Sequence, residues 1–534
     1  MTAGNDPMSI AVQGAALVSL IWSCAVFLVQ TIGITQLYRS HSSPRPKPVS
    51  PSLGDGEAPH VTIIRPVKGL EPCLYDCLAS TFLLAYPRSK LTIYLCVAST
   101  KDPAYPLLRK VVSDFPEFDA KVLVEEDDPV LHGTDGHVNN LGPNPKIRNM
   151  SRAYREAKGD LIWIVDCNVW LGTGSAGRMV DKLCGFGPNG TRTTPYKFVH
   201  QLPLVVDIDT PRTAEQQSLL PKDASLPQAP RSPLDYGGRL EEMFMSTSHA
   251  KFYSAINTVC VAPCIVGKSN MFRKSHLDFM TDPSRNPVLS ASDAGRGRGL
   301  DFFSSYICED HLIGDLIWRS PAPDAAAVTY RNHGLVFGEV AIQPTSGMSV
   351  AAYVARRVRW LRVRKWTVLL ATLVEPGIEP FLCALHLSFA LTTLPWVHER
   401  LGVPRTWGAM AVIWASTVTA WMALDRWFSS MLHRLQSVEV DANTPWFALG
   451  SARRGGIPRR PFREWLVAWL GRETLALPIW TWAVLLGTTV NWRGKQFRVR
   501  MDMSVVEIEG QRAPPSAPSG DASRPDSRSK HRID

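Results

Sequence analysis

The residues Asp160-Leu-Ile-Trp-Ile-Val-Asp166 carry the clearest fold signal in the chain, because an apolar run leads directly into a carboxylate. Such a run predicts a buried strand, and ligands in α/β sheets bind beyond the carboxyl ends of the strands. A carboxylate at the end of so buried a strand needs a strong partner, such as a metal ion or a cationic side chain. Asp166 is therefore the first candidate site residue.

Similar runs flank this one on both sides. They are short, rich in β-branched residues and separated by helical or loop segments: Val61–Ile64, Leu91–Val97, Lys121–Val124 and Phe198–Val206. This spacing predicts an α/β domain with a mainly parallel sheet and crossover helices, which we place at residues 61–345. Two polar segments, 127–143 and 208–239, are interpreted as insertions into it.

The composition indicates that a soluble part and a membrane part are joined in one chain. The 534 residues are 45% hydrophobic and 20% charged, with a mean hydropathy of −0.05. These values exclude a largely disordered chain and argue against a pure multi-span transporter. Thirteen of the 17 tryptophans lie between Trp360 and Trp492, and tryptophan concentrates at membrane–water interfaces.

The N-terminal run Ile10–Ile34 has no charged side chain and is long enough to cross a bilayer, which takes about 20 residues. Arg39, Arg45 and Lys47 follow it, so the positive-inside rule puts its C-terminal end in the cytosol. We predict a signal anchor within residues 1–39, with a lumenal N-terminus, and a Pro-rich linker at 40–60. The alternative is a buried core helix.

Three further uncharged runs predict a C-terminal membrane region at residues 375–500: Pro380–His398, Thr406–Leu424 and Thr474–Trp492. The first two are expected to form a hairpin, because an arginine-rich and therefore cytosolic segment follows them. The third contains Pro478 and either spans or re-enters. Residues 501–534 are predicted to be a disordered tail.

A basic cluster lies just before this region, although the whole chain carries a formal charge of only +10. Its members are Arg356, Arg357, Arg359, Arg362, Arg364 and Lys365. Its place beside apolar segments favours anionic lipid headgroups or a phosphate-bearing substrate over nucleic acid, and predicts a basic interfacial helix at 346–374. Arg356 and Arg359 would share a helix face and could hold a pyrophosphate, with Trp360 stacking on an acceptor. The alternative is a polybasic headgroup anchor.

Two further aspartates have the context of a site. Asp102 follows the Leu91–Val97 run, and Asp310 lies in Tyr306-Ile-Cys-Glu-Asp-His311 before an apolar helical segment. An isolated aspartate after a strand is more often a turn or helix cap.

The ten cysteines form no Cys-x-x-Cys pair and lack histidines at zinc-site spacing, which predicts free thiols.

The order of these features resembles the inverting membrane glycosyltransferases with a GT-A fold, whose signature is Asp, Asp, Asp, (Gln/Arg)-x-x-Arg-Trp. Within that group the chain is most similar to ceramide glucosyltransferases, from about residue 10 to about residue 500. The stretches that carry the resemblance are Arg65-Pro-Val-Lys-Gly69, Asp102-Pro-Ala104, Asn144-Pro-Lys-Ile147, Asp160–Asp166, Val199-His-Gln-Leu-Pro203, Thr247-Ser-His249, Cys264 with Gly267, Met271-Phe-Arg-Lys274, Glu309-Asp310, Arg356–Trp360 and Trp492-Arg-Gly-Lys-Gln-Phe-Arg498.

The resemblance implies roles for individual residues. Asp102 would help to hold the nucleotide, Asp166 would lie at the metal and diphosphate, and Asp310 would be the general base, with Glu309 raising its pKa. The remaining matched positions fall into three groups: nucleotide-sugar-binding Lys68, Lys146 and Arg356; Arg359 and Trp360 near the diphosphate and acceptor; and His200, Cys264 and Glu309 in the acceptor pocket. Core packing is the alternative for His200 and Cys264.

The implied reaction transfers glucose from UDP-glucose to the primary hydroxyl of ceramide with inversion, on the cytosolic face of a Golgi or ER/Golgi membrane. A divalent cation, Mg²⁺ or Mn²⁺, is implied as cofactor. Many GT-A enzymes have Asp-x-Asp at the second aspartate, whereas this chain has Asp166-Cys-Asn168. The neutral Asn168 would bind a metal weakly, or leave it mainly to the diphosphate.

Two other classes of function fit parts of the pattern. A processive polysaccharide synthase of the chitin or hyaluronan type shares the signature, but needs more membrane helices to form a polymer channel. A non-catalytic membrane scaffold could keep the fold, although none of the signature residues is missing. The sequence favours no particular oligomeric state.

Overall fold

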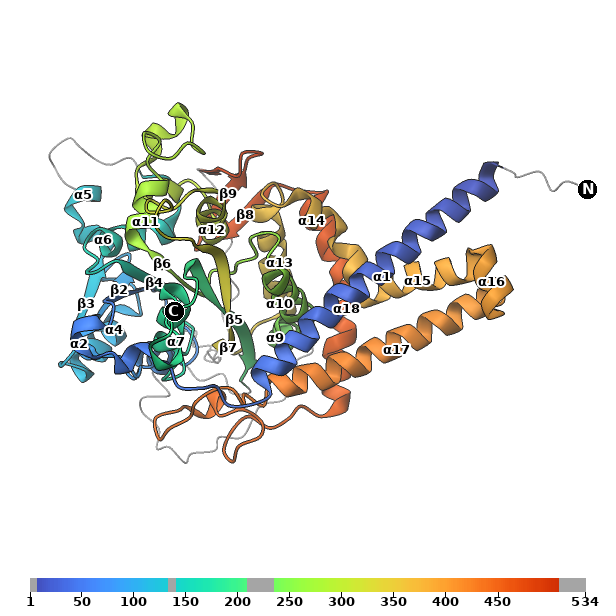
Figure 1. Cartoon of the computed structure of the whole chain (residues 1–534), viewed down its shortest axis with the longest axis horizontal. Coiled ribbons are helices and arrows are strands. Elements are labelled where there is room, and N and C mark those ends of the chain that lie inside the picture. The colour runs from blue at the N-terminus through green and yellow to red at the C-terminus, as the bar shows by residue number, and fades with distance from the viewer. Residues whose placement is uncertain (1–6, 133–140, 209–234, 509–534) are drawn as a thin grey trace, which may run out of the picture.

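The computed structural model describes residues 7–132, 141–208 and 235–508, and Figure 1 shows a sheet domain with a helical arm projecting from it. The sheet has seven strands in the order β3-β2-β1-β4-β6-β5-β7. Their bounds are β1 Val61–Pro66, β2 Leu91–Val97, β3 Asp119–Val124, β4 Leu161–Val165, β5 Tyr196–Asp207, β6 Ser269–Arg273 and β7 Arg331–Thr345. All pairings are parallel except the two that β6 makes. The predicted α/β fold class with a mainly parallel sheet is confirmed.

Strand β4 is continuously apolar because helices cover both faces of the sheet. On β4, Leu161, Trp163 and Val165 face one hydrophobic core, and Ile162 and Ile164 face the other. The helices of this domain are α3 Leu74–Ala79, α4 Tyr105–Asp114, α5 Pro129–His132, α6 Pro145–Arg155, α7 Ser175–Cys184, α9 Gly237–Phe244, α10 Ala250–Val259, α11 Lys274–Met280, α12 Glu309–Arg319 and α13 Val350–Arg364. A π-helical turn, Met245–His249, joins α9 to α10.

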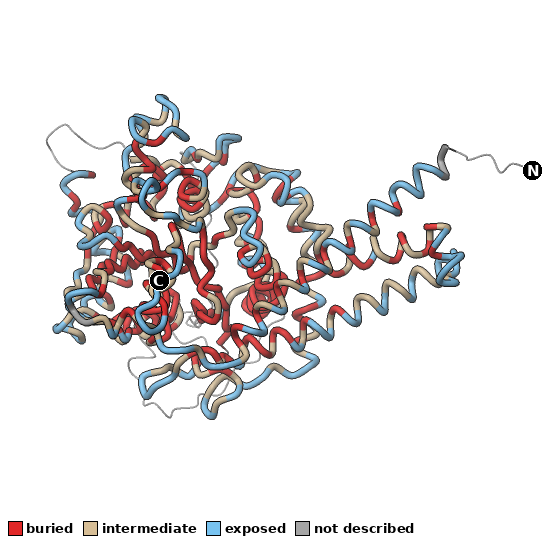
Figure 2. The backbone as a smooth tube through the Cα atoms, viewed as in Figure 1, coloured by how far each residue is buried: buried red, intermediate tan, exposed pale blue. Residues whose placement is uncertain are grey.

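The arm in Figure 1 consists of α1 Pro7–His41, α15 Pro380–Thr393, α16 Pro395–Leu401 and α17 Trp407–Leu432. Ile10–His41 and Trp407–Leu432 are long and apolar enough to cross a membrane. A third crossing is possible if Leu369–Ile378 and Pro380–Thr393, bent by 74°, form one broken span. Parts of the arm are exposed (Figure 2), and its exposed residues include large apolar ones such as Val18, Leu28 and Val412, which lipid would cover.

The structure contradicts a spanning helix over Thr474–Trp492. Helix α18, Phe462–Val484, ends inside this run and contains the buried pair Arg472 and Glu473. Thr489–Trp492 is instead the first strand, β8, of a small sheet with β9 Lys495–Val499 and β10 Val505–Glu507. A tail that is disordered from residue 501 is therefore also wrong, whereas its last part, 509–534, lies outside the described residues.

Two other boundaries differ from the prediction. The segment 40–60, predicted to be a linker, is attached to α7, because the Val49 and Ser50 amides donate to the Asp181 carboxylate at 2.6 and 2.8 Å. The insertion placed at 208–239 ends earlier, since α9 already begins at Gly237; its centre, like residues 133–140 of the other insertion, lies outside the described residues.

Candidate active site

A cavity of about 660 Å³ opens beyond the carboxyl ends of β1 and β4. Pro66, Asp166 and Asn168 reach it from these strands, and the first turn of α12 brings Glu309 and Asp310. This is where an α/β sheet is expected to bind its ligand.

Lys146 connects the carboxylates of this cavity. Its Nζ lies 3.0 Å from Asp166 Oδ1 and 3.1 Å from Glu309 Oε1, and Lys268 Nζ lies 2.9 Å from Asp166 Oδ2. Burial alone would raise the pKa of Asp166, but the two ammonium groups outweigh it and hold that pKa well below its usual range. Asp166 is therefore ionised, and its charge is balanced by lysines.

The first turn of α6 fixes Lys146. Asn144 caps this helix, since its side-chain oxygen accepts from the amides of Lys146 at 2.7 Å and Ile147 at 3.1 Å. The Asn144 amide nitrogen donates to the Tyr306 carbonyl and to Glu309. One side chain thus ties Lys146 to the segment that carries Glu309 and Asp310.

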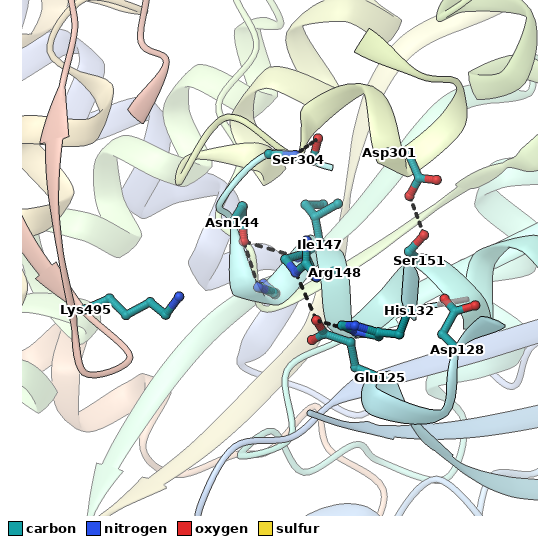
Figure 3. A network of polar contacts seen from close by, with 12 residues as sticks. Glu125, Asp128, His132, Asn144, Ile147, Arg148, Ser151, Asp301, Ser304 and Lys495 are labelled. Atoms are coloured by element: carbon teal, nitrogen blue, oxygen red, sulfur yellow. Dashed lines mark hydrogen bonds and ion pairs between the residues drawn. The ribbon is translucent and has the colours of Figure 1, made fainter. Parts of the chain in front are cut away.

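Figure 3 shows how the rest of α6 is held. Arg148 Nε donates to Glu125 at 2.9 Å, and Ser151 Oγ donates to Asp301 at 2.6 Å. Both contacts lie further along the helix than its Asn144 cap. The position of Lys146 therefore depends on a helix anchored at several points.

Asp310 lines the cavity, and Gly267 makes room for it, because a Cβ at Gly267 would lie 2.8 Å from Asp310 Oδ2. Burial raises the pKa of Asp310 even though Lys146 opposes the shift, and Asp166 adds to it. The expected cause was Glu309, but Glu309 is paired with Lys146. Burial thus replaces the neighbouring carboxylate as the main reason for the raised pKa.

The Arg-x-x-Arg-Trp box lies on α13, and Arg356, Arg359 and Trp360 all line the cavity. Arg356 Nε lies 2.8 Å from Glu241 Oε1, and its guanidinium stacks over Trp360 at 4.7 Å. Arg359 makes no ion pair within the described residues. Burial lowers its pKa to about 10, with Arg356 contributing, so it stays charged.

Other members of the basic cluster are satisfied inside the protein. Arg357 and Arg364 both pair with Glu375. Arg362 and Lys365 donate to the backbone carbonyls of Thr489 and Val484 at 2.6 and 2.9 Å. A polybasic anchor for lipid headgroups is therefore the wrong interpretation of these four side chains.

Asp102 and Lys68 lie on neighbouring turns. Asp102 accepts from the Gly69 amide at 3.0 Å and the Ala104 amide at 2.9 Å, and lies outside the cavity lining. Lys68 does line the cavity and donates to the Arg493 carbonyl. Asp102 thus shapes the turn that presents Lys68.

The two acceptor-pocket candidates are separated by Tyr253. Cys264 lines the cavity, whereas His200 is fully buried behind it. Tyr253 also lines the cavity, and its hydroxyl hydrogen-bonds His200 Nδ1. An apolar group of lining residues adjoins them: Phe244, Phe252, Ile256, Pro263, Val363, Val368, Ala371 and Ile378.

Comparison with known proteins identifies the family. The sequence profile described as glycosyl transferase family 21 matches residues 18–208 and 231–505. The chain belongs to this family. A ceramide glucosyltransferase of Pyricularia oryzae is 57% identical, covering 94% of this chain and 96% of its own. A ceramide glucosyltransferase of Gibberella zeae is 51% identical, and the match covers 96% of this chain and 98% of the relative. One of Komagataella phaffii is 34% identical, and the match covers 92% of this chain and 92% of the relative.

A solved structure with a similar arrangement is the mannosyltransferase PcManGT from Pyrobaculum calidifontis in complex with GDP-Man and Mn²⁺. Its identity is 14% and the TM-score is 0.37, covering 79% of this chain and 96% of that one.

The donor set of this family 21 chain does not form a tight metal site from protein groups alone. Within the described residues no group of three or more His, Cys, Asp or Glu side chains is placed to hold a metal ion. Asp166 is occupied by two ammonium groups, and Asn168 lies beside Glu71, with its own Oδ1 buried and unpartnered.

Sequence reasoning missed several residues of the family 21 site. Lys268 precedes β6, a strand without an apolar run, and Tyr253 lies on a helix with no motif of its own. Trp492 and Arg493 lie at the end of the uncharged run Thr474–Trp492, which predicts a membrane segment rather than the wall of a cavity. In the structure both line the cavity.

Proposed function

We propose that this protein transfers glucose from UDP-glucose to the primary hydroxyl of ceramide with inversion, releasing UDP. The curated relatives named ceramide glucosyltransferase support this proposal. The single structural observation that carries it is the composition of the cavity wall. Cations and carboxylates suited to a sugar nucleotide adjoin an apolar group suited to a hydrocarbon chain.

The residues of the cavity can divide the reaction between them. Asp310 takes the proton of the attacking hydroxyl, since its raised pKa makes it a better base than an ordinary aspartate. Arg359 stabilises the negative charge that gathers on the leaving diphosphate. Asp166 and Glu309 hold Lys146 in place rather than reacting.

The membrane arm suits an acceptor that stays in the bilayer. The apolar cavity residues lie on α10 and around α13 and α14 Leu369–Val374, and α10 packs against α1. Ceramide would enter from this side. We place the catalytic domain in the cytosol, where UDP-glucose is found, on a Golgi or ER/Golgi membrane.

Asp166 would hold a divalent cation only together with the diphosphate of the bound sugar nucleotide. The cation would supply additional charge for the leaving group. The lysines that hold Asp166 and the neutral Asn168 support this order over a cation resident in the free enzyme.

The test is a direct assay. Membranes that contain the protein are incubated with radiolabelled UDP-glucose and a fluorescent short-chain ceramide, with Asp166→Ala alongside. Labelled monohexosylceramide from the wild type alone would support the proposal. Label in a high-mass polymer would favour the polysaccharide synthase, and no label in either product would favour the scaffold.

A further inference from the structure

The C-terminal hairpin places an arginine at the cavity. Strands β8 and β9 pair from Thr489–Arg498 to Trp492–Lys495, which leaves a two-residue turn of Arg493 and Gly494. Both turn residues have positive φ, 51° and 81°. This is the backbone of a type I′ turn, which matches the twist of the flanking strands and needs Gly, Asn or Asp more than arginine. Arg493 therefore adopts an unfavourable φ at a tip that lines the cavity.

The hairpin is built into the catalytic domain. Val490, Phe497, Val499 and Val505 belong to one hydrophobic core with the segment that leads to Asp310. The Val505 amide donates to the Ser305 carbonyl at 2.8 Å. The tip is thus held by packing on the same segment that positions the base.

Arg493 joins two other cations that lack a carboxylate. Lys68, Arg359 and Arg493 all line the cavity, and none of them makes an ion pair within the described residues. The Lys68 ammonium donates to the Arg493 carbonyl, and Arg493 contributes to lowering the pKa of Arg359. Lys146 and Lys268, by contrast, share Asp166.

Cations brought together without a counter-charge repel one another, which costs stability unless an anion binds between them. The arrangement therefore suits a ligand with several negative charges, and a diphosphate carries them.

We propose that Arg493 is a further substrate-binding residue, which contacts the diphosphate of the sugar nucleotide together with Lys68 and Arg359. The inference rests on the proposed function and deepens it. As the acceptor oxygen bonds to C1, the bond from C1 to the diphosphate oxygen breaks and its electron pair stays on that oxygen. The acceptor proton goes to Asp310, and Arg493 stabilises the oxygen that gains charge.

The experiment measures nucleotide binding, which needs no turnover. UDP and uridine are titrated into the full-length protein in nanodiscs, for the wild type, Arg493→Ala, Arg493→Lys and Arg498→Ala. A lost charge-assisted contact should weaken UDP binding roughly 10- to 100-fold in Arg493→Ala. Arg493→Lys should recover part of this loss, and uridine binding should be unchanged in all variants.

Arg498 is the matched control, because it lies exposed on β9 of the same hairpin and outside the cavity lining. Arg498→Ala should bind UDP like the wild type. The proposal is overturned if Arg493→Ala binds UDP normally, or if it loses UDP and uridine equally, since the second result would mean that the hairpin itself is damaged. If the protein binds UDP as expected but does not glucosylate ceramide, the proposed function fails while the diphosphate contact stands.

Discussion

Asp310 differs from the other carboxylates of the cavity, because it makes no ion pair within the described residues while Asp166 and Glu309 share Lys146. A general base must accept a proton, and a carboxylate that is ion-paired with an ammonium group is a weaker base. We expect Asp310→Asn to lower kcat by about 10²- to 10⁴-fold, with KM for UDP-glucose nearly unchanged. Steady-state kinetics would contradict the assignment if kcat stayed within a few-fold of the wild type.

The pH profile tests the same residue independently. Burial raises the pKa of Asp310, so the ionised form that accepts a proton is lost as the pH falls through that raised value. The acid limb of kcat/KM for the acceptor should therefore lie above the ordinary aspartate pKa of about 3.9. Lys146 opposes the shift, and Lys146→Met should move the limb to still higher pH. A limb that stays in place in this variant would mean that another group titrates.

Because Asp166 is paired with two lysines, we expect metal binding to depend on the presence of nucleotide. Because Lys146 and Lys268 hold its carboxylate at 3.0 and 2.9 Å, the free enzyme should bind Mn²⁺ weakly. Addition of UDP should increase the bound fraction, as measured from the electron paramagnetic resonance signal of free Mn²⁺. Asp166→Asn should reduce this UDP-dependent binding. Tight binding to the wild type without nucleotide would show that the lysines are displaced by the metal alone.

The Asn144 cap of α6 is expected to contribute both to the stability of the protein and to its activity. Asn144→Ala removes the side-chain oxygen that accepts from the Lys146 and Ile147 amides, at a cost of about 1 kcal/mol. It also frees the segment that carries Glu309, so kcat should fall as well. Thr406 is the matched control, since it caps α17 through the Ala409 amide far from the cavity.

Thr406→Ala should lower the unfolding midpoint by a similar amount without changing kcat. Unfolding is followed by tryptophan fluorescence and kcat by the ceramide assay. Equal loss of kcat in both variants would mean that any weakened helix start reduces activity, and that Asn144 has no special link to the site.

Helices and strands were predictable from the sequence where a single local pattern specifies them. Strands β1, β2 and β4 are buried along their whole length and read as apolar runs, and α1 carries no charged side chain from Ile10 to Ile34. Strand β6 was missed because Ser269 and Asn270 are polar and only Met271 and Phe272 are apolar, so it contains no apolar run. Its position comes from pairing with β4 and β5. Thr474–Trp492 looks like a span by composition, but the hairpin packs on a core whose other members lie far away in the sequence.

The whole molecule is joined by a buried ionic network between the catalytic domain and the membrane arm. Lys251 on α10 pairs with Asp425 on α17 at 2.5 Å, and both are fully buried. Trp469 on α18 donates to the same carboxylate at 2.9 Å. These contacts fix how the arm meets the domain, and hence where a membrane-bound acceptor would reach the cavity.

Removing one partner of such a pair leaves the other charge buried without compensation, which costs about 3–5 kcal/mol. Asp425→Leu should therefore lower the unfolding midpoint strongly, whereas Lys251→Met combined with Asp425→Leu should recover most of the loss. The double variant leaves no unpaired ammonium group at position 251, and Arg472, which also lies 3.8 Å from Asp425, keeps its pairs with Glu379 and Glu473. Glu399→Ala, an exposed carboxylate on α16, is the control and should change little. Unfolding of the full-length protein in nanodiscs measures all four proteins, and a double variant as unstable as Asp425→Leu would show that the pair contributes through packing rather than charge.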